Sequence, residues 1–170
     1  MICGSGKDKL RAYHVVSAFV TENHLTLGEI CVEETTNEIT AVLELLDLID
    51  VKGDIVTADA MSCRKKIVEK IIDKKADYTI GLKQNQPALY NNAEDYFKEF
   101  SADIPSKTTI EKGHGRIEKR KYQLLTDLSW LEQKDEWNGL NTQRPMFRAA
   151  LKPTLLLDIL FDPSSVSPQK

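Results

Sequence analysis

Apolar residues in the first third of the chain form a pattern that predicts two strands followed by a helix. The runs 13–20 (YHVVSAFV) and 25–32 (LTLGEICV) are rich in β-branched and aromatic residues, which favour strands. A short polar turn separates the two runs, so we expect a β-hairpin. Apolar residues then recur at helical spacing from Ile39 to Ile49, and Gly53 ends this pattern.

Capping and turn residues mark the boundaries of the next predicted elements. Thr35 and Glu38 have the three-residue spacing of a capping box, so we expect the first helix to begin there. Residues 54–58 (DIVTA) form a short predicted strand that leads directly into Asp59. A second helix is predicted over 63–76, because its isoleucines and valine form one apolar stripe among lysines.

The middle of the chain continues the alternation of strands and helices. Residues 78–82 predict a strand, the polar segment 83–86 follows it, and Pro87 begins a third helix. Residues 107–111 and 116–125 are predicted strands around a glycine-containing turn. This order predicts an α/β fold in which helices pack on a mixed sheet. The residues of the third helix that we expect in the core are Ala93, Tyr96, Phe97 and Phe100.

Composition limits the classes of protein to consider. The chain has 170 residues, 41% of them hydrophobic and 29% charged, which is typical of one globular domain. It contains no apolar run long enough to span a membrane. Three widely spaced cysteines without a C-x-x-C pair favour reduced thiols in the cytoplasm, and the histidines lack the spacing of a zinc site. The net charge of −3 restricts any nucleic-acid surface to a local basic patch.

Asp59 is the candidate catalytic residue with the clearest position. A carboxylate at the carboxyl end of a buried strand faces the crevice where α/β sheets usually bind ligands. The same position also suits an aspartate that caps the next helix. The residues alone leave both interpretations open.

Four segments together give the chain a family resemblance. These are HVVSAFVTENHLTLGE, NEITAVLELLDLIDVKGDIVTADAM, YTIGLKQNQ and KGHGRIEKRKY. They resemble the DDE transposases of the ISAs1 insertion-sequence family, which includes the H-repeat-associated proteins, over about Lys7 to Leu140. The resemblance implies a bacterial, cytoplasmic protein with a ribonuclease-H-like fold that cuts and joins transposon ends. It also implies Mg²⁺ or Mn²⁺ held by three carboxylates, with Asp59 as the second of the three and a metal ligand.

The other two acids of the family pattern are not found at matching positions. The family's first aspartate belongs to an Asp-Gly-Lys segment, whereas this chain has only MICGSGK there. The third acid belongs to a His-Trp-x-Ile-Glu-Asn-like motif, which the chain lacks. We therefore expect residues 1–140 to be a partial catalytic core with an incomplete sheet. Residues 141–170, broken by prolines, are expected to be a divergent, irregular tail. The chain is expected to be a truncated fragment that binds metal poorly and is inactive.

Several polar residues are candidates for DNA contact. The side chains of Lys83 and Gln86 suit phosphate and base-edge contacts, although the segment could equally be a polar loop that caps the Pro87 helix. Arg116 and Arg120 lie in the densest basic cluster of the chain and are candidates for contact with the DNA backbone. Glu118 could substitute for the third acid or form a structural ion pair.

The resemblance also implies the partners of the chain. They are the DNA of transposon ends and either a second copy of the chain or an intact transposase, with no membrane. An alternative to an ancestral enzyme is a non-catalytic DNA-binding remnant that interferes with an intact transposase. A further alternative is a product that folds poorly, because loss of the first strand exposes a sheet edge.

Overall fold

The structure is a computed structural model that describes residues 14–32, 37–113, 116–140, 145–151 and 155–161. For residues 111, 113, 116–120, 145–151 and 155–161 it describes the backbone alone. The chain divides into two compact units, residues 1–49 and residues 50–170, and each is described by itself. Within the described residues, no helix has both the length and the apolar character needed to cross a membrane.

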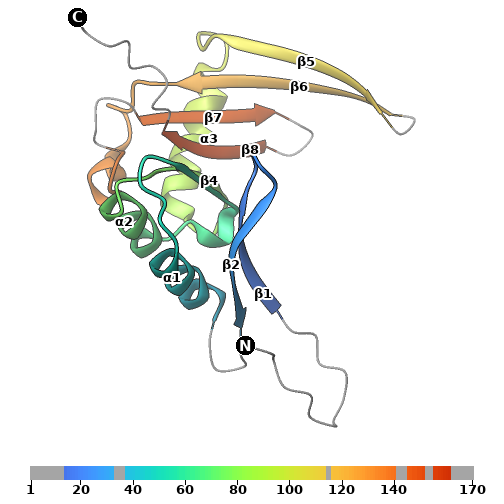
Figure 1. Cartoon of the computed structure of the whole chain (residues 1–170). Helices are drawn as coiled ribbons and strands as arrows, with labels where there is room; N and C mark the ends of the chain where they lie inside the picture. Colours follow the sequence, from blue (N-terminus) through green and yellow to red (C-terminus); the bar gives the residue numbers. More distant parts are fainter. Residues whose placement is uncertain (1–13, 33–36, 114–115, 141–144, 152–154, 162–170) are drawn as a thin grey trace, which may run out of the picture. The chain divides into compact units, whose positions relative to one another are not determined.

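The first unit is a β-hairpin with one helix, as the sequence predicts. Strands β1 (His14–Val20) and β2 (Leu25–Val32) pair antiparallel and form a two-stranded sheet (Figure 1). Helix α1 (Glu38–Leu48) packs on this hairpin. Gly28 in β2 allows this packing, because a Cβ there would lie 3.1 Å from Cδ1 of Leu45.

The first helix is capped by a different residue from the one predicted. The side chain of Asn37 accepts a hydrogen bond from the backbone nitrogen of Thr40 at 2.9 Å, so Asn37 is the N-cap. The predicted capping box used Thr35, which lies outside the described residues. An asparagine at this position satisfies an unpaired N–H of the first helical turn as well as a threonine does.

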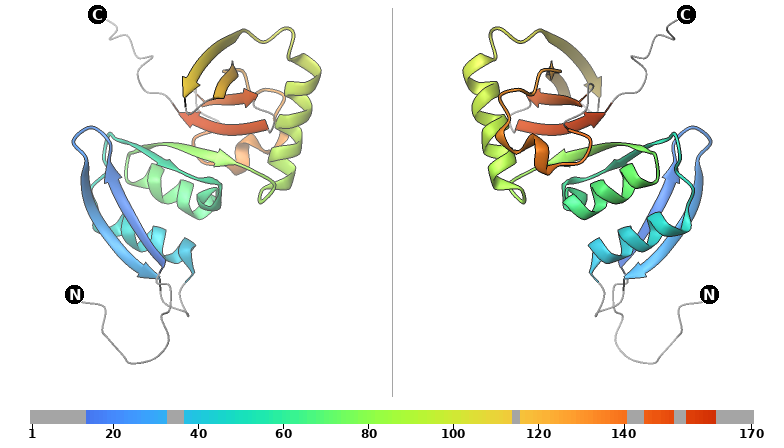
Figure 2. Two further views of the ribbon diagram at one scale, coloured as in Figure 1. Left: turned by 90° about the vertical axis from the view of Figure 1, so that its right-hand side faces the viewer. Right: turned by 90° about the vertical axis from the view of Figure 1, so that its left-hand side faces the viewer.

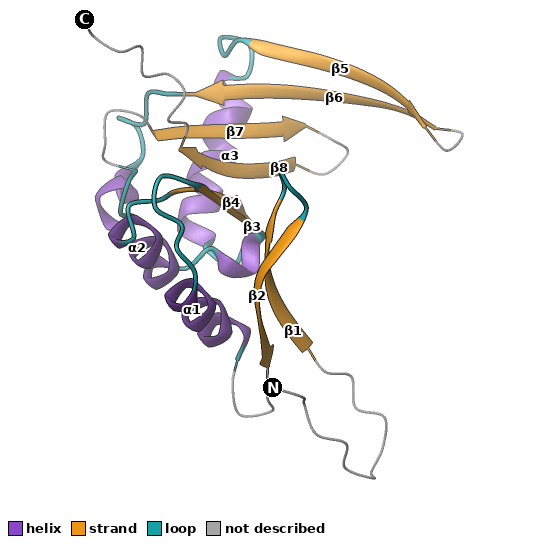
Figure 3. Ribbon diagram, in the orientation of Figure 1, coloured by secondary structure: helices purple, strands orange, loops and turns teal. Residues whose placement is uncertain are grey.

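The second unit contains a six-stranded mixed sheet in the order β3-β4-β8-β7-β6-β5 (Figure 3). Strands β3 and β4 are parallel, and the other neighbouring pairs are antiparallel. The predicted mixed α/β architecture is therefore confirmed. The strands are β3 (Ile55–Ala58), β4 (Asp77–Leu82), β5 (Ser106–Gly113), β6 (Arg116–Leu125), β7 (Pro145–Leu151) and β8 (Leu155–Phe161).

The last two strands correct the expectation of an irregular tail over residues 141–170. Strands β7 and β8 pair with each other and lie in the middle of the sheet, between β6 and β4. Pro145 is compatible with this arrangement, because proline is tolerated at the first residue of a strand.

Two α-helices and two short 3₁₀ helices accompany the sheet of the second unit. Helix α2 (Lys65–Asp73) packs against β4. Helix α3 (Pro87–Phe100) passes behind β7 and β8 in Figure 1 and stands beside them in Figure 2. The short 3₁₀ helices η1 (Ala60–Ser62) and η2 (Glu132–Glu136) complete the unit. The largest fully buried side chains include Tyr78, Ile80 and Leu82 on β4 and Ile67, Val68 and Ile71 on α2.

The predicted core face of α3 is partly correct. Ala93 and Phe97 are buried, whereas Phe100 is 38% exposed. Tyr96 is half-buried and stacks on Trp130, with ring centroids 4.2 Å apart. The ring of Phe100 also contacts the ring of Tyr96. The three aromatic side chains therefore form a partly exposed cluster at the end of α3.

Candidate functional site

Asp59 follows the last residue of β3 and begins the η1 turn. Its side chain is exposed, and its Oδ1 accepts a hydrogen bond from the backbone nitrogen of Met61 at 3.0 Å. Asp59 therefore stands at the carboxyl end of a strand, and it caps a short 3₁₀ helix and not α2, whose N-cap is Arg64. Its catalytic role stays a prediction. The capping bond fixes one carboxylate oxygen, and the exposed position leaves the group open to a ligand.

Strand β4 places a second loop beside Asp59. Parallel strands present their carboxyl ends at the same edge of a sheet, and β3 and β4 are parallel. Gly81 allows the two segments to approach closely, because a Cβ at this residue would lie 3.2 Å from the backbone nitrogen of Ala60. The turn after β3 therefore rests directly on the end of β4.

The loop after β4 donates two side-chain hydrogen bonds to the turn after β3. Nδ2 of Asn85 donates to the carbonyl oxygen of Ala60. Nε2 of Gln86 donates to the carbonyl oxygen of Cys63 at 2.8 Å. Gln86 is also the N-cap residue of α3, but its side chain forms no capping bond. The sequence pointed to Gln86 as a possible DNA ligand and did not predict that these two amides join the two loops.

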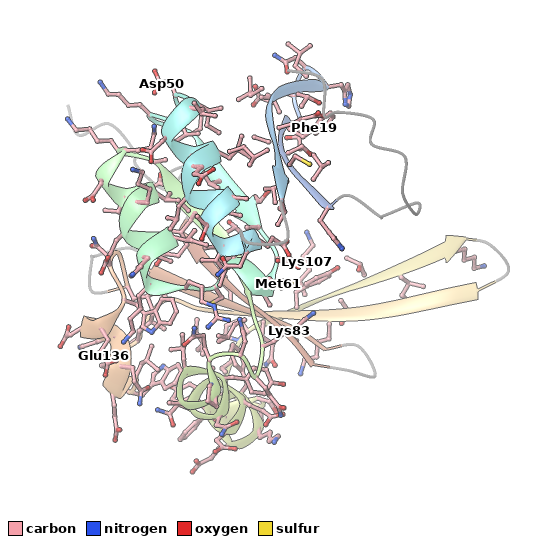
Figure 4. All side chains as sticks on the ribbon, turned by 90° about the horizontal axis from the view of Figure 1, so that it is seen from below. Phe19, Asp50, Met61, Lys83, Lys107 and Glu136 are labelled. Atoms are coloured by element: carbon pink, nitrogen blue, oxygen red, sulfur yellow. The ribbon has the colours of Figure 1, made fainter. Side chains whose placement is uncertain are left out.

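Lys83 stands at the start of the same loop with its side chain exposed (Figure 4). Met61, which follows Asp59 in the turn, is 52% exposed. The predicted contact of Lys83 and Gln86 with DNA stays a prediction. Lys83 is available for it, whereas Gln86 already uses its donor within the protein.

Cys63 closes the turn and is fully buried. Burial raises the pKa of its thiol to about 12, and the neighbouring Arg64 guanidinium opposes this shift. A thiol in this state is neither a nucleophile nor a metal ligand. The exposed carboxylate of Asp59, and not this cysteine, is therefore the candidate reactive group of the site.

The predicted basic residues lie on the β5–β6 hairpin. The register pairs Gly113 with Arg116 and Thr109 with Arg120. Arg116, Arg120 and Tyr122 are separated by even numbers of residues, so their positions share one face of β6. Tyr122 pairs with the exposed Lys107 on β5. One face of the hairpin thus carries the basic positions Arg116, Arg120 and Lys107, interrupted by the paired positions Glu118 and Glu111.

The strand register shows that this face of the hairpin continues across the sheet to the end of β4. Four positions pair in sequence across the sheet: Leu124, Arg148, Asp158 and Gly81. Side chains alternate between faces along a strand, so these positions share a face with the two arginine positions. On β4, the buried side chains of Tyr78, Ile80 and Leu82 lie on the opposite face of the sheet. The two arginine positions and the contact of Gly81 with the Asp59 turn are therefore on the face away from this core.

Comparison with known proteins agrees with the resemblance seen in the sequence. The family model described as "Transposase DDE domain" matches residues 3–161. The chain belongs to the DDE transposase family. Members of this family carry out DNA transposition with divalent metal ions, and the family has a ribonuclease-H-like fold. The match extends through β7 and β8, so it covers strands in the segment expected to be divergent.

Several bacterial relatives of this DDE transposase chain are longer than it is. YncI of Escherichia coli O157:H7, provisionally named a transposase, is 41% identical over 136 residues, which are 76% of this chain and 34% of that protein. A protein from the dhlA 3′ region of Xanthobacter autotrophicus is 36% identical over 78% of this chain and 45% of its own length. YhhI of Escherichia coli K12, provisionally named an H-repeat-associated transposase, is 40% identical over 76% of this chain and 35% of that protein.

The chain therefore spans between about a third and just under a half of these relatives. No solved structure is significantly similar to it.

The described residues of the DDE transposase chain do not by themselves fit a two-metal site. No group of three or more His, Cys, Asp or Glu side chains gathers among them in a metal-binding arrangement. Glu118, the candidate substitute for the third acid, is described by its backbone alone, paired with Glu111 across the hairpin. Asp59 is one carboxylate, whereas a two-metal centre needs several oxygen ligands.

Proposed function

We propose that this chain is part of the catalytic core of a DNA transposase and supplies Asp59 to its metal-dependent strand-cleavage and transfer site. The observation that carries the proposal is the position of Asp59. It is an exposed carboxylate at the carboxyl end of a parallel strand, in a chain whose family uses such carboxylates. The relatives in the H-repeat group favour the ISAs1 subfamily.

We further propose that a polypeptide of these 170 residues is catalytically inactive by itself. One carboxylate cannot hold two divalent ions against water, because each ion would have too few protein ligands. The test is a strand-transfer assay with a matching transposon end and Mg²⁺, for the wild type and for Asp59→Ala. Product formed by the wild type and lost in Asp59→Ala would overturn the proposed inactivity. Product that persists in Asp59→Ala would point to a contaminating nuclease.

A direct metal measurement tests the role of Asp59 without relying on turnover. Mn²⁺ is paramagnetic and broadens the NMR signals of nearby amides. If Asp59 is a ligand, increasing Mn²⁺ should broaden the signals of Ala60 and Met61 first, and Asp59→Asn should remove this effect. Asp54→Asn is the matched control, because Asp54 is also exposed and lies at the other end of β3. Equal broadening in all three proteins would contradict the proposed role.

The second candidate function is DNA binding without catalysis, by the chain alone or in competition with an intact transposase. The observation that favours it is the placement of Arg116 and Arg120 on one face of the β5–β6 hairpin. If Arg116 and Arg120 contact the DNA backbone, binding should weaken as salt rises, and Arg116→Ala with Arg120→Ala should reduce the slope of log K against log salt by about 2. This effect should be the same with and without Mg²⁺.

A double variant elsewhere on the surface controls for net charge. Lys52→Ala with Lys66→Ala removes the same charge from exposed positions outside the hairpin. Equal salt slopes in the two double variants would show that the hairpin is not the DNA surface. A chain that does not bind DNA in low salt would exclude this second function.

A further inference from the structure

We propose that Asn85 and Gln86 are positioning residues that hold the carboxylate of Asp59 in place, through hydrogen bonds to the turn that carries it. This inference rests on the proposed role of Asp59 in the transposase site. It assigns Asn85 a role that its sequence context did not indicate, and it gives Gln86 a role within the protein. Neither residue touches the reacting groups in this proposal.

The turn that carries Asp59 has little structure of its own to fix it. The η1 helix contains only Ala60–Ser62, and its internal bonds run from Ser62 N to Asp59 O at 3.2 Å and from Cys63 N to Ala60 O at 3.1 Å. Runs of 3₁₀ helix this short have poor hydrogen-bond geometry and leave terminal carbonyls without helical partners. External contacts are therefore needed to give the turn one conformation.

Asn85 and Gln86 supply those contacts at both ends of the turn. Asn85 donates to the Ala60 carbonyl, next to Asp59, and Gln86 donates to the Cys63 carbonyl at the far end. Both donors come from one loop, which begins where β4 ends. The two bonds thus attach the peptide groups at both ends of the turn to the loop that follows β4.

Asn85 holds the turn through its amide nitrogen and not through its amide oxygen. Its Oδ1 is buried and accepts no hydrogen bond from any described residue, whereas its Nδ2 is bonded to Ala60. Replacing Nδ2 with an oxygen would remove the only donor and set a carboxylate against a carbonyl oxygen. Asn85→Asp is therefore a nearly isosteric change that breaks the contact without changing side-chain volume.

Gly81 provides the third restraint on the turn. Its missing side chain lets the backbone of Asp59 and Ala60 lie against β4, with 3.2 Å between a hypothetical Cβ and Ala60 N. The backbone of β4 contacts the turn at Gly81, and the side chains of Asn85 and Gln86 form hydrogen bonds to it. With these restraints the carboxylate is fixed before any ligand binds, which is what metal-dependent catalysis requires of its ligands.

The Met61 amide reports directly on this arrangement, because it donates to Oδ1 of Asp59. In Asn85→Asp and in Gln86→Glu, hydrogen exchange of the Met61, Ser62 and Cys63 amides should accelerate by about tenfold or more, because the restraint is lost. Exchange in β4, at Tyr78 and Ile80, should remain as in the wild type. The matched controls are Gln84→Glu and Asn91→Asp, which make the same changes at exposed positions in the loop and on α3.

The Mn²⁺ titration separates this inference from the proposed function. If both are correct, Mn²⁺ should broaden the Ala60 and Met61 signals at severalfold higher concentration in Asn85→Asp and Gln86→Glu than in the controls. If wild-type protein shows no such broadening but exchange is faster in the two variants, the metal role fails and the positioning role stands. If Met61 exchanges in both variants as in the wild type, the positioning role is wrong. Should Asn85→Asp fail to fold, Gln86→Glu alone decides between these outcomes.

Discussion

Gly81 of β4 lies against the turn after β3. A methyl group at this position would be 3.2 Å from Ala60 N and 3.6 Å from the carbonyl carbon of Asp59. Backbone atoms cannot rotate away from such a contact, so the turn itself must move by a few tenths of an ångström. The absence of a side chain at Gly81 is therefore a condition for the position of Asp59.

We predict that Gly81→Ala lowers the free energy of unfolding by about 1–3 kcal/mol, the usual effect of overpacking, and displaces the Asp59 turn. Chemical denaturation measures the first effect, and the amide chemical shifts of Ala60 and Met61 measure the second. Gly53→Ala is the control. Gly53 has φ of +81° and no atom near its missing Cβ, so alanine there should destabilise by backbone strain without moving the turn. Unchanged shifts in Gly81→Ala would contradict this account.

Cys63 allows a prediction from its pKa. Burial raises the pKa of this thiol to about 12, so the group stays protonated in the folded protein at pH 8. We predict that iodoacetamide modifies Cys63 at least about a hundredfold more slowly than an unfolded cysteine, whose pKa is near 8.5. Peptide mass mapping at increasing urea should show modification of Cys63 only as the second unit unfolds. Rapid labelling without urea would show that the turn opens freely.

The same pKa shift sets the sign of a pH effect. The folded pKa lies above the unfolded pKa, so the contribution of Cys63 to stability is complete below the unfolded value and decreases as pH rises toward 12. Burial also raises the pKa of Tyr78, whose hydroxyl donates to the carbonyl oxygen of Asn138 at 2.9 Å. Both groups therefore make the folded state less stable in alkaline solution.

At the scale of elements, local patterns were sufficient to predict most helices and strands. The hairpin, the three helices and the strand before Asp59 follow from apolar spacing and turn residues close in sequence. The last two strands were harder to predict, because β7 and β8 pair with β6 and β4, which lie at least 20 residues away in sequence. Their prolines suggested loops, and tertiary pairing overrode that local signal.

The site was predictable only in part for the same reason. The position of Asp59 could be predicted, because the strand and its end are local features. The bonds from Asn85 and Gln86 span 25 and 23 residues, and nothing in the short segment 83–86 indicates their acceptors. The parallel pairing of β3 and β4 offered one signal, since it brings both loops to one edge of the sheet.

The N-cap of α1 gives a prediction at the scale of one helix. Asn37 accepts a hydrogen bond from Thr40 N at 2.9 Å, and no other capping side chain acts there among the described residues. We predict that Asn37→Ala destabilises α1 by about 1 kcal/mol. Amide exchange in the first turn of α1 measures this change. Asn91→Ala is the control, because it removes the same side chain from an exposed position in the middle of α3.

At the scale of the whole molecule, the six-stranded sheet ends at β3 and β5. Strand β3 has β4 as its neighbour on one side, and no other strand of the described sheet pairs with its second edge. Such an edge presents unpaired N–H and C=O groups to a strand from another molecule. Ile55 at its beginning is 47% exposed, so an apolar contact can accompany the backbone pairing.

We predict that the chain self-associates through β3 and that Ile55→Lys lowers this association severalfold. A lysine on an edge strand disfavours pairing through its charge, and at a half-exposed position it should leave the folded state intact. Sedimentation velocity over a range of protein concentrations measures the association, and thermal unfolding verifies the fold. Leu48→Lys is the matched control, because Leu48 is 74% exposed but lies at the end of α1. If both variants associate as the wild type does, then the edge of β3 is not the contact. Loss of association in both variants would indicate a general effect of the added charge. In that case the edge of β3 would have no specific role in self-association.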